Sequence, residues 1–318
     1  MLFKSLVPSL RQLTGALALG TLLAAQGAQA DGRTLETRFG SVSVDADVQR
    51  VVTLYEGALD AAVAVGIKPV GAITTRGGDG VASYIQSQLS DTRIVGTARE
   101  TNLESVIALQ PDLILTSSRL SKEQYQLLSA VAPTLVPDFN MFEQDAWKKE
   151  SLFFARALDR EEQMKQVLGQ IDQRTAQVKT RFDQALPDSG RQATLARWMP
   201  QGALLMSDKL FAGSLLTAAG FEMQDAGIIQ AGRPHSSPLS QEKLSLIDGD
   251  WLFLATLNED GEQALEAARQ SPAFLRLDVV QNDHVIPVDG QLFSSASGPL
   301  AAGAILDRLE QAIEQAGQ

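Results

Sequence analysis

Arginines are the side chains of this sequence with the clearest capacity to bind a ligand. Most of them follow or end a short apolar run typical of a buried β-strand, and one lies in a Gly-Arg-Pro loop. The five residues are Arg76, Arg99, Arg119, Arg197 and Arg233. In open α/β sheets, ligands bind beyond the carboxyl ends of the strands. Each arginine alone could be a solvated surface charge, but the repetition at strand ends predicts one cleft whose guanidinium groups neutralise carboxylates or other anionic oxygens.

Aromatic residues accompany these arginines. Tyr55 comes directly after the first apolar strand, Trp198 is next to Arg197, and Phe293 lies in the last loop. Aromatic faces pack well against a flat or apolar ligand body. We therefore predict that all three line the same cleft, with a place in a hydrophobic core as the alternative for each of them.

The composition excludes several classes of function. The 318 residues contain no Cys, which rules out disulfides, iron–sulfur clusters, thiolate zinc sites and cysteine nucleophiles. With only two histidines, His235 and His284, a His-built metal site is not expected. The net charge of −11 argues against a nucleic-acid partner, because phosphate binding needs a basic face. Neither a Gly-x-Ser-x-Gly motif nor a P-loop is present. We predict no catalytic residue, no metal ligand and no cofactor.

The first thirty residues have the pattern of a secretory signal peptide. Lys4 and Arg11 form a basic start, an apolar run follows, and residues 28–30 are a small-x-small cleavage site. Removing residues 1–30 with these two bases takes the net charge from −11 to −13. The predicted location is therefore the periplasm of a bacterium. An uncleaved, buried N-terminal helix is the alternative.

Strand and helix patterns alternate along the rest of the chain. Apolar runs at residues 51–54 and 112–116 alternate with helical stretches at 56–65 and 102–109, which predicts an α/β fold with mostly parallel sheets. Ser121-x-x-Gln124 has the pattern of a capping box at the start of a further helix.

The second half of the chain repeats part of the first. Residues 103–115 align without gaps to residues 241–253, and each segment has a Glu on its first helical turn and an Asp that opens a strand. This repeat predicts two similar lobes. A capping box at Asp159-x-x-Glu162 and apolar residues spaced three and four apart predict one long helix between them. We predict an N-terminal lobe at 31–158, a connecting helix at 159–186 and a C-terminal lobe at 187–318. A single connecting helix would permit only a small rocking motion.

Several segments of the sequence resemble a known family. They are Arg50-Val51-Val52-Thr53-Leu54, Val65-Gly66-Ile67-Lys68-Pro69-Val70-Gly71, Val95-Gly96-Thr97, Asn102-Leu103-Glu104 and Leu109-Gln110-Pro111-Asp112-Leu113-Ile114. In these segments the chain resembles the periplasmic iron-siderophore and vitamin B12 binding proteins of ABC importers. The Val-Gly-Thr segment and Ser117-Ser118-Arg119 are similar to those of the ferric citrate (iron-dicitrate) binders within that family.

The resemblance implies a class III periplasmic binding protein, in which two α/β lobes joined by one backbone helix hold the ligand in a cleft. It also implies docking on an inner-membrane permease through one Glu of each lobe. The matching residues here are Glu104 and Glu242. An acidic residue on a first helical turn also stabilises the helix, so these two glutamates have a local role as well.

The predicted function is capture of a ferric siderophore or ferric citrate-type chelate by a monomer that delivers it to an inner-membrane ABC importer. Iron would stay wrapped in its chelator, so the protein would need no metal ligand of its own. A haem or cobalamin carrier is an alternative, and in a haem carrier Tyr55 or His235 could serve as the axial ligand. A periplasmic siderophore esterase with His235 or His284 as the base is a less favoured one.

Overall fold

The computed structural model describes residues 32–143, 145–185 and 190–316. The predicted signal peptide lies outside these ranges. No helix within them combines the length and the apolar character that a membrane span needs. An antiparallel hairpin of β1 (Arg33–Thr37) and β2 (Gly40–Val44) begins the described chain.

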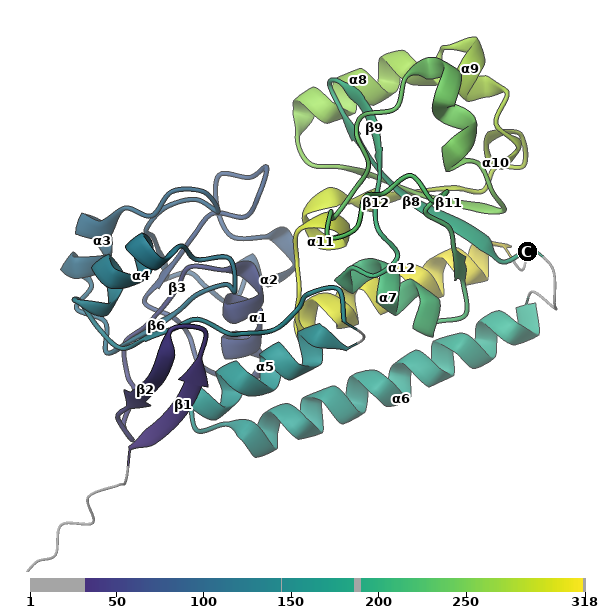
Figure 1. Cartoon of the computed structure of the whole chain (residues 1–318). Coiled ribbons are helices and arrows are strands. Elements are labelled where there is room, and N and C mark those ends of the chain that lie inside the picture. The colour runs from purple at the N-terminus through teal and green to yellow at the C-terminus, as the bar shows by residue number, and fades with distance from the viewer. Residues whose placement is uncertain (1–31, 144, 186–189, 317–318) are drawn as a thin grey trace, which may run out of the picture. The chain divides into compact units, whose positions relative to one another are not determined.

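The first half of the chain builds a five-stranded parallel sheet, which we call the N-sheet (Figure 1). Its order is β5 (Arg93–Ile94), β4 (Gly71–Ala72), β3 (Val51–Thr53), β6 (Leu113–Leu115) and β7 (Thr134–Leu135). The helices of this half are α1 (Glu56–Ala64), α2 (Ser83–Gln86), α3 (Leu103–Ala108) and α4 (Lys122–Ser129). Strands β3 and β6 are entirely buried, which explains why their sequences are apolar throughout rather than alternating.

The second half builds another five-stranded sheet, the C-sheet. Four parallel strands follow the order β10 (Glu222–Met223), β8 (Gln192–Met199), β11 (Trp251–Thr256) and β12 (Val285–Asp289), and β9 (Gly202–Leu205) pairs antiparallel with β8. Its helices are α7 (Phe211–Ala218), the 3-10 helix η1 (Gln241–Ile247), α8 (Glu259–Arg269), α9 (Pro272–Leu275), α10 (Asp278–Gln281) and α11 (Gly290–Ser294). The prediction of an α/β fold with mostly parallel sheets is confirmed.

Three longer helices complete the fold: α5 (Ala146–Ala157), α6 (Glu161–Ala185) and α12 (Pro299–Ala316). Figure 1 shows α6 running alongside α5 and α12, and both contacts are extensive. The predicted apolar face of the long helix is correct, because Met164, Leu168 and Phe182 are among its buried residues. The predicted capping box is wrong. Asp159 has a left-handed φ of 56°, and its carboxylate lies 3.7 Å from the Arg33 guanidinium instead of capping α6.

Two of the helix starts follow local cap chemistry that the sequence predicts. The Asn102 side chain accepts a hydrogen bond from the Ser105 amide at 2.9 Å and begins α3. The Ser121 hydroxyl accepts from the Gln124 amide at 3.2 Å and begins α4. Each cap satisfies an amide that has no partner inside the helix.

The internal repeat corresponds to the same device in both sheets. The Asp112 carboxylate accepts hydrogen bonds from the amides of Gln49 at 2.8 Å and Arg50 at 2.9 Å. The Asp250 carboxylate accepts from the Gln192 amide at 2.8 Å. Asp112 precedes β6 and binds the residues just before the neighbouring strand β3. Asp250 precedes β11 and binds the first residue of the neighbouring strand β8.

Helix α6 is not the only connection between the two sheets. Asp60 on α1 is fully buried, and its carboxylate accepts hydrogen bonds from the amides of Leu300 at 2.9 Å and Ala301 at 2.8 Å in the first turn of α12. The Ser83 hydroxyl donates to the Asp289 carboxylate at 2.9 Å. These side-chain contacts add to the backbone connection predicted at residues 159–186.

Candidate ligand-binding site

A cavity of about 540 Å³ lies where loops from the carboxyl ends of both sheets meet. The N-sheet contributes the loops after β3, β4, β5, β6 and β7, and α5 forms one wall. The C-sheet contributes Arg197 of β8, the segment before α7, Pro234 and His235, and residues 293–297. This is the edge at which open α/β sheets bind ligands, and the volume suits a small molecule.

Four of the five predicted arginines line this cavity: Arg76, Arg99, Arg119 and Arg197. Within the described part of the chain, none of their guanidinium groups has a carboxylate within 4.0 Å. Lys209 lines the cavity as well. The cavity is therefore rich in positive charge for which the fold itself supplies no close counter-charge.

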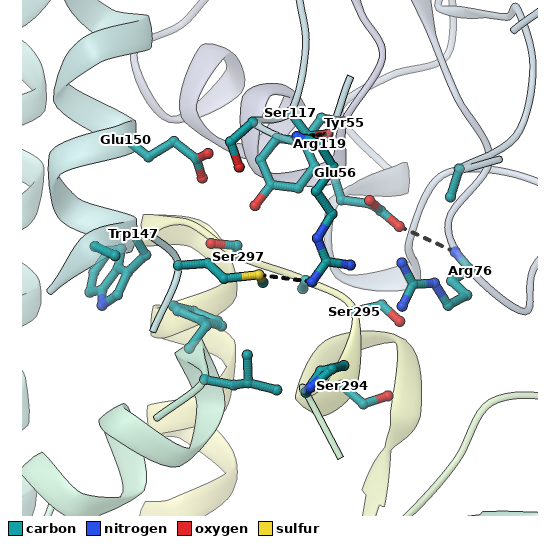
Figure 2. Close-up of a pocket in the computed structure, with 18 of the residues that line it drawn as sticks. Tyr55, Glu56, Arg76, Ser117, Arg119, Trp147, Glu150, Ser294, Ser295 and Ser297 are labelled. Carbon is teal, nitrogen blue, oxygen red and sulfur yellow. Dashed lines mark hydrogen bonds between the residues drawn. The ribbon is translucent and has the colours of Figure 1, made fainter. Parts of the chain in front are cut away.

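Tight turns present two of these arginines. Arg99 lies in a turn closed by the Thr97 amide, which donates to the Glu100 carbonyl at 2.7 Å. Gly96 permits this turn, because its φ is 148° and a Cβ there would lie 2.3 Å from the Glu100 carbonyl oxygen. Arg119 lies in the turn after β6, and its Nη2 contacts the Met141 sulfur at 2.9 Å (Figure 2).

Arg197 has the most unusual environment of the four. Only 5% of the residue is exposed, Nη1 donates to the Ser294 hydroxyl at a long 3.4 Å, and Nε has no acceptor. Burial, aided by the positive charge of Arg76, lowers the pKa of Arg197 to about 10. A buried guanidinium with an unused N–H can donate a hydrogen bond to an anionic oxygen of a ligand.

Acidic groups also line the cavity. Burial raises the pKa of Glu56, although the charge of Arg76 and a hydrogen bond from its amide at 3.3 Å oppose the shift. Burial raises the pKa of Glu150 to about 7, and the neighbouring Tyr55 hydroxyl opposes this shift. Figure 2 shows Glu150 on its helix facing Tyr55. Gly57 makes room for that tyrosine, since a Cβ at this position would lie 2.6 Å from the Tyr55 ring.

Aromatic residues form the remaining wall. Tyr55 and Phe293 line the cavity as predicted, and Phe139, Trp147 and Phe211 join them. Trp147 and Phe211 meet edge to face, with ring centroids 5.3 Å apart. The cavity thus combines a cationic lining with flat apolar surface.

Two predicted residues do not line the cavity. Trp198 is 4% exposed and packs edge to face on Phe274 at 5.9 Å, inside a hydrophobic cluster of the C-sheet. Adjacent strand residues point to opposite faces, so Arg197 and Trp198 cannot both face the cavity. Arg233 is exposed on its loop, whereas the next two residues, Pro234 and His235, do line the cavity.

The two histidines have different surroundings. His235 is part of the cavity wall, and its Nδ1 lies 2.7 Å from the Ser236 carbonyl oxygen. His284 stacks on the Trp251 ring at 4.9 Å, and its Nδ1 lies 2.9 Å from the Asp250 carbonyl oxygen. Only His235 is therefore placed to meet a ligand.

The paired glutamates are found on the surface. Glu104 is exposed on the first turn of α3, and Glu242 is exposed on the first turn of η1. Neither lines the cavity. Their equivalent positions in the two halves agree with the alignment of residues 103–115 with 241–253.

Two α/β halves with mostly parallel sheets, the long helix α6 and a cavity at the carboxyl ends of both sheets are features of a binding protein for small molecules. The chain belongs to the periplasmic binding protein family, whose model matches residues 51–292. Its fold is that of the class III members of that family.

Similar proteins are spread over several bacteria. The Bacillus subtilis protein named "Probable siderophore-binding lipoprotein YfiY" is 27% identical over 287 residues, 87% of this chain and 86% of the relative. The Escherichia coli Fe(3+) dicitrate-binding periplasmic protein FecB is 25% identical over 284 residues, 86% of this chain and 87% of the relative. The crystal structure of Staphylococcus aureus SirA complexed with staphyloferrin B has a TM-score of 0.76 and 25% identity, covering 89% of this chain and 98% of SirA.

Proposed function

We propose that this protein binds a ferric siderophore or ferric citrate-type chelate in the periplasm and delivers it to an inner-membrane ABC importer. The observation that carries the proposal is Arg197, a buried cation whose Nε has no acceptor at the wall of a cavity with three further arginines. Burying an unpaired charge lowers stability. An anionic ligand that supplies the counter-charge explains why such a residue is present.

The chemistry of the cavity favours a chelator with several carboxylates or comparable anionic oxygens. Guanidinium groups form paired hydrogen bonds with carboxylates, and the aromatic wall suits the backbone of an organic chelator. The names of the relatives support this class, since YfiY is named for siderophore binding and FecB for ferric dicitrate. Iron is the cargo in this proposal and the chelator holds it.

Tryptophan fluorescence tests ligand binding directly. Trp147 lines the cavity, whereas Trp198 and Trp251 are buried in the cores. Titration with ferric citrate and with hydroxamate and catecholate ferric complexes should give saturable quenching by at least the carboxylate type. Most of that quenching should be lost in Trp147→Phe. If no member of the panel binds saturably, the proposal is wrong, and a Soret band on addition of haem would support the haem-carrier alternative.

We also propose that Glu104 and Glu242 dock the protein on its permease. Both are exposed and occupy equivalent positions in the two halves. The double variant Glu104→Ala with Glu242→Ala should bind ferric citrate normally but should not support its uptake by cells. Glu123→Ala, an equally exposed glutamate on the first turn of α4, is the matched control and should support normal uptake.

The proposal includes an exported monomer of two lobes, at 31–158 and 187–318, joined by residues 159–186. Mass spectrometry of protein from a periplasmic extract should show an N-terminus at Asp31, and light scattering should give the mass of one chain. An intact N-terminus would contradict cleavage of the predicted signal peptide.

A further inference from the structure

One carboxylate of the cavity wall has no close counter-charge. Glu150 on α5 lines the cavity opposite the arginines, and no described Lys, Arg or His nitrogen lies within 4.0 Å of its oxygens. A negative charge here would repel the anionic ligand that the rest of the lining is suited to bind. The position of Glu150 therefore needs an explanation.

The two lysines that precede Glu150 on its own helix form ion pairs with other acidic residues. Lys148 Nζ lies 2.6 Å from Asp172 on α6 and 3.3 Å from Asp145. Lys149 Nζ lies 3.3 Å from Glu143. Arg156, the remaining cation of α5, lies 2.9 Å from Glu161. Glu150 therefore lines the cavity without a cation from its own helix.

Groups from the neighbouring elements do not supply one either. Helix α1, packed on α5, brings Glu56 and the buried Asp60, and Tyr55 precedes it. Helix α6 brings Asp172, which is paired with Lys148. The cations that line the cavity are Arg76, Arg99, Arg119, Arg197 and Lys209, and none of their nitrogens forms an ion pair with Glu150.

The group that does interact with Glu150 is the Tyr55 hydroxyl, which also lies beside Ser297 (Figure 2). The carboxylate is half-buried, and this burial raises its pKa and favours the neutral form more than in an exposed glutamate, although the Tyr55 hydroxyl opposes the shift. A neutral carboxyl group carries an O–H donor that an ionised one lacks. Protonation therefore turns Glu150 from a repulsive group into a hydrogen-bond donor for a ligand oxygen.

We propose that Glu150 is a specificity-determining residue that takes up a proton as the ligand binds and then donates a hydrogen bond to an anionic oxygen of the chelate. The inference rests on the proposed function. Two kinds of donor then recognise the chelate. The arginines are charged at all relevant pH values, whereas Glu150 on α5 can donate only when it is protonated. Binding then weakens as the pH rises, because an ionised Glu150 must first be neutralised.

The size of the effect follows from proton linkage. Burial brings the pKa of Glu150 to about 7 in the free protein. If the complex holds Glu150 neutral throughout, the affinity at pH 8 should be about tenfold lower than at pH 6, and binding at pH 7 should take up about half a proton.

Calorimetric titration with ferric citrate at pH 6, 7 and 8, in two buffers of different ionisation enthalpy, measures both quantities. Glu150→Gln keeps a donor but cannot ionise, so we expect it to bind more tightly than the wild type at pH 8 and to lose the proton uptake. Glu143→Gln removes another carboxylate of the same cavity, one that is exposed and paired with Lys149, and should keep the wild-type pH slope. Protonation of ferric citrate itself contributes equally to the affinity of every variant at a given pH, so a difference between variants at that pH comes from the protein.

Tyr55→Phe gives a second, independent test. The hydrogen bond from Tyr55 lowers the pKa of Glu150, so its removal should shift the midpoint of the pH dependence upward. The inference is overturned if Glu150→Gln or Tyr55→Phe binds ferric citrate with the pH slope and proton uptake of the wild type. If neither ferric citrate nor any hydroxamate or catecholate ferric complex binds to any variant at any pH, the proposed function is overturned instead, and this inference with it.

Discussion

Replacing Arg197 with Met should make the protein more stable and less able to bind its ligand. The side chain is 5% exposed, its Nε has no acceptor, and no described carboxylate lies within 4.0 Å. Met has similar length and fills the same wall without a charge. Substitution of buried charges by apolar residues of similar volume often stabilises a protein.

The magnitude follows from the cost of burying the charge. Burial lowers the pKa of Arg197 from its ordinary value to about 10, which corresponds to about 3 kcal/mol against the charged form. Below pH 10 the group is protonated in both states, so an assay at pH 7 includes the whole cost. Relaxation around the charge reduces the cost, and we expect a gain of about 1–3 kcal/mol in the free energy of unfolding. Loss of charge-assisted hydrogen bonds should weaken ferric citrate binding by about 10–100-fold.

Urea unfolding of the ligand-free protein and calorimetric titration with ferric citrate measure the two effects. Arg99→Met is the control for stability, because Arg99 is exposed and its removal should change the free energy of unfolding by less than about 0.5 kcal/mol. A loss of stability in Arg197→Met would show that the guanidinium supports the fold. Unchanged binding would refute its role in the site.

Two further predictions concern the contact between α1 and α12. Asp60→Ala removes the acceptor of the Leu300 and Ala301 amides and of the Tyr84 hydroxyl and should cost about 2–4 kcal/mol at pH 5.5. Burial raises the pKa of Asp60 from 3.8 to about 7, so the wild type loses stability as the pH rises between these values, and the cost of the variant should be smaller at pH 8. If urea unfolding shows that the loss of unfolding free energy in Asp60→Ala grows with pH, this prediction is wrong. Gly298→Ala should lower the melting temperature, because Gly298 has a φ of 125° and a Cβ there would lie 2.4 Å from Asp60 Oδ1. Gly169→Ala, on α6 with nothing within 4 Å of the added Cβ, should raise it; equal melting temperatures would refute the steric argument.

Local patterns predicted much of the fold and part of the site. Cap residues such as Asn102 and Ser121 act within three residues of themselves, so the sequence alone reveals them. Arg76, Arg99 and Arg119 could be grouped because parallel strands end at a common edge. The prediction that Trp198 lines the cavity is wrong, because strand alternation places it on the face opposite to Arg197.

Other parts of the site depend on packing between distant elements. Trp147 and Glu150 reach the cavity because α5 packs on α1 and α6, and no local pattern indicates that arrangement. Lys209 and His235 come from irregular segments whose course is set by the C-sheet. The left-handed turn at Asp159 likewise involves a residue distant in the sequence, because its carboxylate pairs with Arg33 instead of making the predicted cap.

The Asp60 contact has a consequence for the order in which the chain folds. Its hydrogen bonds to Leu300 and Ala301 join residues 240 and 241 positions apart. Contacts this distant in sequence close late, because the loop between them must be ordered first. Until α12 has formed, α1 carries a carboxylate that cannot be buried with its partners. A nascent chain that ends before Pro299 would therefore remain incomplete even in its first half, which delays native structure until nearly the whole sequence has been made.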